Sequence, residues 1–73
     1  MTKLGEYLGK KSVSKAEISR KTGLSTSRLY QLTNNESTIL RADELYMIAV
    51  AIDVNPCDML ETLFGELREK MGR

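Results

Sequence analysis

The sequence predicts an all-α fold, a compact domain of five helices that spans residues 1–73 as a single unit. Three observations support this class. Aromatic residues, which strands favour, are scarce, since the chain has no Trp and one Phe. Apolar residues recur at helical spacing along most of the chain. Residues that favour helix N-caps stand directly before several of these periodic segments.

Two helices are predicted in the first third of the chain. The first covers residues 2–10, and its inner face carries three apolar residues, Leu4, Tyr7 and Leu8. The second follows Ser14, whose hydroxyl would accept a hydrogen bond from the Glu17 amide while the Glu17 carboxylate bonds the Ser14 amide, as in a capping box. It ends at Gly23, because glycine readily adopts the left-handed conformation that closes many helices.

The third helix is predicted over residues 26–33, with Ser25 as its N-cap. The two asparagines at 34–35 would close it, because asparagine tolerates left-handed geometry. Its inner face carries two apolar residues, Leu29 and Leu32.

The fourth helix is predicted over residues 41–52, with one apolar stripe made of Leu45, Ile48, Ala49 and Ile52. Asp43 and Glu44 are expected to be surface charges near the positive end of this helix. The fifth helix is predicted over residues 56–71, with Asn55 as its N-cap. Its apolar face carries Met59, Leu60, Leu63, Phe64, Leu67 and Met71. The single cysteine, Cys57, is expected to be a small buried apolar residue.

The composition is that of a globular protein, with 41% hydrophobic and 29% charged residues. No apolar run approaches the roughly 18 residues that a membrane span needs, and the N-terminus has no signal-peptide pattern. We therefore expect a cytoplasmic protein without a membrane partner.

The charges are unevenly distributed along the chain. Residues 1–34 carry seven basic and two acidic residues, whereas residues 35–73 carry four basic and eight acidic ones. An oriented contact with a polyanion such as DNA would explain this asymmetry. Chance segregation of charge in a small helical protein is the alternative.

The second and third helices form a motif at residues 14–34, joined by a very short turn that contains Gly23. The small side chain of Ser19 lets the two helices cross closely. An apolar seam fixes them to each other through Ile18, Leu24, Leu29 and Leu32. The outward positions of the third helix are polar and rich in Ser and Thr, which are mediocre helix formers. They indicate contact with base edges in a DNA major groove, with a solvated surface as the alternative.

Residues 14–35 (SKAEISRKTGLSTSRLYQLTNN) resemble the phage-repressor and Cro-type, or Xre-like, helix-turn-helix DNA-binding domains. The resemblance covers about residues 2–64 and includes LYMIAVAIDVN at 45–55 and DML at 58–60. It implies a compact phage-repressor-like domain that binds double-stranded DNA sequence-specifically as a small transcriptional regulator of the repressor kind. Such a protein is associated with the nucleoid when it is bound to DNA.

The resemblance also implies which residues contact DNA. Base edges would be touched by residues after the cap of the third helix and one turn later, namely Thr26, Ser27, Arg28 and Gln31. Phosphates would be bound at the start of the motif, on the third helix and in the loop after it, by Ser14, Lys15, Tyr30, Asn34, Thr38 and Arg41. No metal, cofactor or small-molecule ligand is expected.

The chain departs from the family at three places. Lys15 stands where relatives often have Gln, and a lysine binds phosphate but accepts no hydrogen bond. Ser19 stands where many relatives have Ala. Leu8 and Thr33 stand where some relatives have an Arg–Glu pair, so we expect no buried ion pair.

The apolar stripe of the last helix continues beyond the part that the resemblance covers. Its members are Leu60, Phe64, Leu67 and Met71. Three roles are open for this stripe: it covers the core, it forms a homodimer interface, or it docks a different protein in an antitoxin-like arrangement. A two-fold dimer would place two reading helices on half-sites about 34 Å apart.

Catalysis is not expected of this chain. It has no His, its single Cys lacks the usual catalytic partner, and no Gly-rich phosphate loop is present. The absence of His also argues against a Cys/His metal site. Two function classes remain, a DNA-binding regulator and a protein-interaction module on the same fold whose DNA binding is weak or lost.

Overall fold

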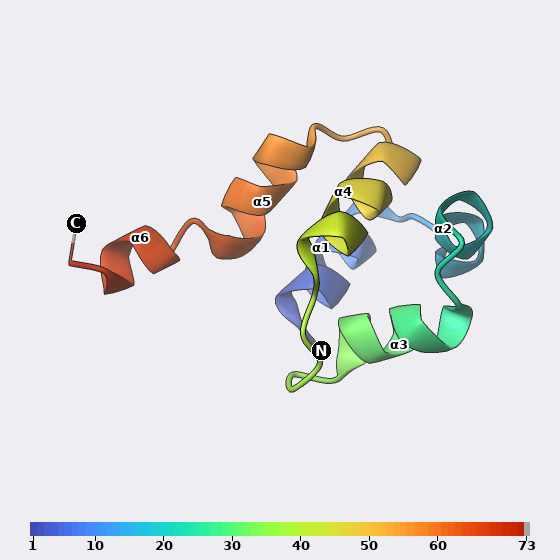
Figure 1. Cartoon of the computed structure of the whole chain (residues 1–73), viewed down its shortest axis with the longest axis horizontal. Helices are drawn as coiled ribbons and strands as arrows, with labels where there is room; N and C mark the ends of the chain where they lie inside the picture. The colour runs from blue at the N-terminus through green and yellow to red at the C-terminus, as the bar shows by residue number, and fades with distance from the viewer. Residues whose placement is uncertain (73) are drawn as a thin grey trace.

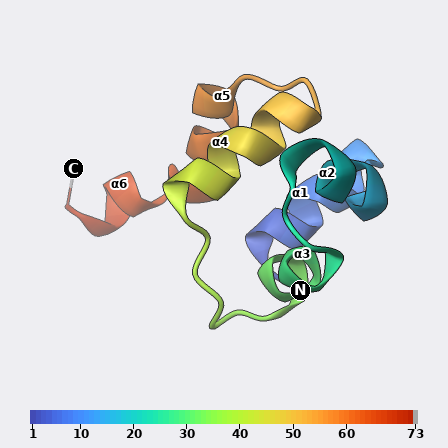
Figure 2. The ribbon, with the colours of Figure 1, turned by 45° about the vertical axis from the view of Figure 1, so that its right-hand side comes forward.

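The computed structural model describes residues 1–72, which form six helices and no strand. The helices are α1 (Lys3–Lys11), α2 (Lys15–Thr22), α3 (Thr26–Asn34), α4 (Ala42–Ala51), α5 (Pro56–Phe64) and α6 (Leu67–Lys70). Five of them gather around one core, and α6 projects from it (Figures 1 and 2). The predicted all-α class is therefore confirmed, with one helix more than expected. None of these helices is both long enough and apolar enough to cross a membrane.

The core draws on all five of the gathered helices. Its buried apolar residues are Leu4, Leu8, Ile18, Leu29, Leu32, Leu45, Ile48, Ala49, Met59 and Leu63. Most of the inner-face residues predicted from the periodicity are among them, and burial of each large one contributes about 1.5–3 kcal/mol. α1 packs against α3 and α5, whereas α2 packs against α3 and α4. The motif formed by α2 and α3 is thus packed against α1 on one side and against α4 on the other.

The predicted N-caps of α2, α3 and α5 are confirmed. The side chains of Ser14, Ser25 and Asn55 each accept a hydrogen bond from a backbone amide in the first turn of the helix that follows. Gly23 ends α2 in the left-handed conformation, with φ 84°. These positions fix where each helix of the motif begins and where α2 ends.

Two details differ from the prediction, the return hydrogen bond from Glu17 to Ser14 and the conformation that ends α3. The Glu17 carboxylate pairs with Arg20, one turn further along the exposed face, and so does not complete a capping box. Asn35 ends α3 in an extended conformation (φ −103°, ψ 110°) rather than a left-handed one. Its side-chain oxygen accepts a hydrogen bond from the Ser37 amide at 3.0 Å, and this Asx turn redirects the chain.

The single helix predicted over residues 56–71 is two helices in the structure. Gly65, a poor helix former, follows the last residue of α5. Beyond it, the amides of Arg68 and Glu69 bond the carbonyls three residues back, at 3.1 and 3.0 Å, instead of those four residues back. α6 therefore begins as a separate short helix and contains no buried residue. The interpretation in which this segment folds back over the core is corrected accordingly.

Cys57 is exposed, contrary to the expectation that it is buried. It is the second residue of α5, whose buried residues are Met59 and Leu63. Because successive residues of a helix are separated by about 100°, Cys57 lies on the side opposite these two.

Candidate nucleic-acid interface

The second helix of the motif, α3, presents a polar face to solvent. Leu29, Leu32 and Thr33 are buried on its inner side. The opposite arc carries five exposed residues, Thr26, Ser27, Tyr30, Gln31 and Asn34. The sequence of α3 contains no acidic residue. This face is therefore open to an anionic partner.

The start of α3 is held by the turn that joins it to α2. The Thr22 hydroxyl donates a hydrogen bond to the Ile18 carbonyl at 2.7 Å and accepts one from the Leu24 amide at 3.1 Å. One residue later the Ser25 hydroxyl caps α3. These bonds fix the angle between the two helices of the motif.

The end of α3 is held by the N-terminal segment, which lies beside it in Figure 1. The Thr2 hydroxyl donates to the Leu32 carbonyl at 2.7 Å, and the Thr2 amide donates to the Thr33 carbonyl at 3.0 Å. The approach is close, because a Cβ on Gly5 would lie 2.3 Å from the Thr33 carbonyl oxygen. Thr2 thus satisfies carbonyls that a helix end leaves unbonded. Sequence reasoning did not single out this anchor, because it joins residues far apart in the chain.

The side chain of Gln31 is oriented by the loop after α3. Its Oε1 atom accepts a hydrogen bond from Asn35 Nδ2 at 3.2 Å and has a longer contact of 3.5 Å with the Thr38 hydroxyl. Its amide nitrogen makes no hydrogen bond within residues 1–72. The nitrogen is therefore free to donate to an acceptor on a base edge, such as N7 of adenine.

Arg28 differs from the other residues predicted to contact bases. Its Nε and Nη2 atoms donate to the two carboxylate oxygens of Glu44 at 2.8 and 2.9 Å, and Nη2 also donates to the Ile39 carbonyl at 3.0 Å. The side chain of Glu44 is 2% exposed and that of Arg28 is 34% exposed. The structure therefore places the Arg28 guanidinium beside the exposed face of α3, turned toward α4.

Glu44 is buried, which corrects the expectation that it is a surface charge. Its carboxylate also accepts a hydrogen bond from the Arg41 amide at 2.9 Å. The hydrogen bonds from Arg28 hold the pKa of Glu44 below its ordinary value, although burial acts in the opposite direction. The expectation of no buried ion pair, drawn from Leu8 and Thr33, is wrong, because the chain forms such a pair at two other positions, Arg28 and Glu44.

The six residues predicted to bind phosphate lie at three places on the surface. They are Ser14 and Lys15 at the start of α2, Tyr30 and Asn34 on α3, and Thr38 and Arg41 between α3 and α4. Lys15 is exposed and has no ion-pair partner in the part of the chain that the structure describes. Arg41 pairs with Asp43 at 2.9 Å on the surface, and this pair lowers the pKa of Asp43. A phosphate at Arg41 would compete with Asp43.

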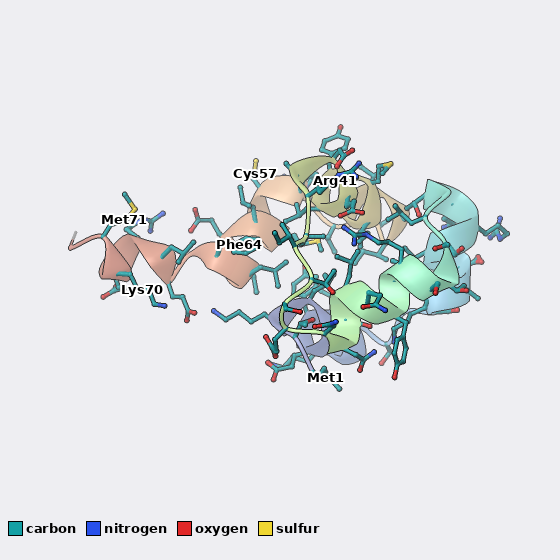
Figure 3. The ribbon with its side chains drawn as sticks, turned by 60° about the horizontal axis from the view of Figure 1, so that its bottom comes forward. Met1, Arg41, Cys57, Phe64, Lys70 and Met71 are labelled. Carbon is teal, nitrogen blue, oxygen red and sulfur yellow. The ribbon has the colours of Figure 1, made fainter. Side chains whose placement is uncertain are left out.

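The predicted dimer stripe lies along the outer side of α5 and continues onto α6, which projects from the core. Its exposed fractions are 49% for Leu60, 39% for Phe64, 47% for Leu67 and 72% for Met71. Figure 3 shows Lys70 and Met71 on the projecting α6, far from Arg41 at the start of α4. Phe64, at the end of α5, lies closer and lines a hollow with Ile39 and Leu40. The part of the stripe on α6 is thus separate from the exposed face of α3.

One comparison with known proteins agrees with this geometry. The profile of the Cro/C1-type HTH (helix-turn-helix) DNA-binding domain matches residues 3–64. The match covers α1 to α5 and ends before α6. No curated protein and no solved structure matches the chain.

Proposed function

Because the chain belongs to the family of Cro/C1-type HTH DNA-binding domains, we propose that it is a sequence-specific transcriptional repressor that reads the major groove of double-stranded DNA with α3. The observation that carries the proposal is the exposed face of α3, which is polar, contains no acidic residue and is anchored at both ends. A helix that is rigid relative to its supporting domain places its side chains reproducibly against base edges.

The contacts divide into those that depend on base identity and those that do not. Thr26, Ser27 and Gln31 contact base edges, because their side chains lie on the exposed arc and carry donors and acceptors. Phosphates are bound around this arc by Ser14, Lys15, Tyr30, Asn34, Thr38 and Arg41. Phosphate contacts set the register of α3 in the groove, and base contacts then select the sequence.

The protein acts as a homodimer whose subunits meet through the stripe Leu60, Phe64, Leu67 and Met71. This stripe is apolar and substantially exposed, and a second copy would remove it from water. A single module buries little DNA surface and binds weakly, whereas two modules address two half-sites at once. Repression follows when the dimer occupies DNA that the polymerase needs.

The test is selection of binding sites from a pool of randomised duplexes at moderate salt. We expect enrichment of a two-fold symmetric motif with half-sites about one helical turn apart. A variant in which Thr26, Ser27 and Gln31 are all replaced by Ala is the matched control, since it keeps the buried face of α3 and should enrich no motif.

Other outcomes would contradict parts of the proposal. An asymmetric short motif would contradict the homodimer while leaving the reading function intact. Binding that disappears as salt rises, with no enriched motif, would leave only attraction to phosphates. In that case the protein-interaction module on the same fold becomes the better account.

A further inference from the structure

One buried carboxylate joins three parts of the molecule. Glu44, in the first turn of α4, accepts hydrogen bonds from the Arg28 guanidinium on α3 and from the Arg41 amide. Arg28 in turn donates to the Ile39 carbonyl, in the loop that links α3 to α4. The planar, bidentate geometry of the Arg–carboxylate pair fixes direction as well as distance. The loop is therefore held against both helices.

The same loop orients Gln31. Thr38, the neighbour of Ile39, lies 3.5 Å from Gln31 Oε1, and Asn35 donates to that oxygen at 3.2 Å. A chain of contacts thus runs from Glu44 and Arg28, through the loop, to a side chain on the exposed face of α3. Gln has several rotatable bonds, so a fixed neighbour reduces the entropy that it loses when it binds a base.

We propose that Arg28 is a positioning residue, which holds the loop after α3 through Glu44 and the Ile39 carbonyl and thereby sets the orientation of the Gln31 amide toward DNA. This inference rests on the proposed function. Arg28 does not itself reach a base, because its release would leave the Glu44 carboxylate buried without a cation. Its loss therefore changes the preference at the base that Gln31 reads.

The experiment measures base preference and salt dependence for Arg28→Met, Glu44→Gln and Gln31→Ala. Arg20→Met is the control, because Arg20 forms an exposed pair with Glu17 on α2. We expect Arg28→Met and Glu44→Gln to reduce discrimination by about tenfold at the same base position that Gln31→Ala affects. Combining either change with Gln31→Ala should cause no further loss there, and the salt slope should stay that of the wild type.

Three results would overturn the assignment in distinguishable ways. If Arg28→Met alters a different base position while Glu44→Gln keeps the wild-type preference, Arg28 reads a base directly. If Arg28→Met reduces the salt slope by about 1, Arg28 neutralises a phosphate. If the wild-type protein itself enriches no motif, the proposed function fails and this inference fails with it.

A second measurement needs no DNA and covers variants that fold poorly. The amides of Ser37 and Thr38 are hydrogen-bonded to Asn35 within the loop, so their hydrogen exchange reports on loop order. The double variant Arg28→Met/Glu44→Met replaces the pair by apolar side chains and avoids an unpaired buried charge. We expect these amides to exchange faster in this variant than in Arg20→Met, and equal exchange would overturn the inference.

Discussion

Individual side chains on the proposed interface differ in the information that they carry. The Gln31 amide nitrogen can donate only to a base edge that presents an acceptor, so its contact depends on which base it meets. The Lys15 ammonium is a positive charge on a flexible stem, so any phosphate satisfies it. Substitutions at these two residues should therefore produce different binding profiles.

Gln31→Ala is expected to relax the preference at one base position. The loss of this base contact should cost about 1–3 kcal/mol of discrimination there and leave the other positions unchanged. Competition between duplexes that differ at single base pairs measures this effect. Equal loss of affinity for every duplex would show that Gln31 does not read a base.

Lys15→Ala is expected to weaken binding to all duplexes by a similar factor, because a phosphate contact is independent of sequence. The slope of the logarithm of affinity against the logarithm of salt concentration should shrink by about 1. Lys70→Ala, on the projecting α6, is the control and should leave the slope unchanged. Indistinguishable slopes for Lys15→Ala and the wild type would remove Lys15 from the interface.

Acid should weaken the Arg28–Glu44 pair. The folded-state pKa of Glu44 lies below its ordinary value of 4.5 because Arg28 donates to its carboxylate. Such a group stabilises the fold above its unfolded pKa, and this stabilisation is lost as the pH falls through the folded pKa. The nearby Arg41 lowers this pKa as well.

The corresponding prediction concerns Glu44→Gln. The difference in unfolding free energy between the wild type and this variant should be largest near about pH 7 and shrink as the pH falls below about 4. Denaturant unfolding at a series of pH values measures it, with Glu17→Gln, which removes an exposed pair, as the control. A difference that does not change with pH would contradict the assignment of the stabilising charge to Glu44.

For individual residues, the sequence predicted contacts with chain neighbours better than contacts with distant parts of the chain. The caps Ser25 and Asn55 act on amides two or three residues away, so their roles follow from adjacent residues. Thr2 and Glu44 act on helices elsewhere in the chain, and only the folded structure brings those partners together. Neither the apolar periodicity nor the residue preferences at helix caps can predict such distant partners.

The turn between α2 and α3 depends on the conformation of Gly23. Its φ of 84° is strained for residues with a side chain, although a Cβ there would meet no neighbouring atom within 4 Å. Gly23→Ala should therefore destabilise the domain by about 1–2 kcal/mol. Gly9→Ala, at an open site within α1, should instead stabilise it by about 0.5–1 kcal/mol. Denaturant unfolding compares the two, and the same sign for both would contradict this account of the turn.

The helices themselves were predictable because their apolar spacing matches the buried face of each one. The end of α5 was not, because the apolar stripe continues through Gly65 to Leu67 and Met71 at helical spacing. Apolar periodicity shows which residues share one face of a helix, but it does not show where the backbone hydrogen bonds break. Gly65, with its low helix propensity, is the residue of the sequence that signals this break.

Two surfaces lie on different parts of the molecule, the exposed face of α3 and the apolar stripe on α5 and α6. Replacement of Leu67 and Met71 by Lys should convert the proposed dimer to a monomer, because the new charges would have to be buried in the interface. Sedimentation equilibrium at tens of micromolar measures this change. Ala16→Lys, at an exposed apolar residue of α2, is the control and should remain dimeric. A wild-type protein that is strictly monomeric with and without DNA would contradict the dimer.

The most direct test of the central claim is an NMR titration of the protein with a selected duplex. If α3 lies in the major groove, the largest shift changes should occur at residues 26–34 and at the start of α2, and nuclear Overhauser contacts should join the Gln31 side chain to base protons. Residues of α6 should change only if they respond to dimer formation. Shift changes confined to α4, α5 and α6, with α3 unaffected, would contradict the claim that α3 reads DNA.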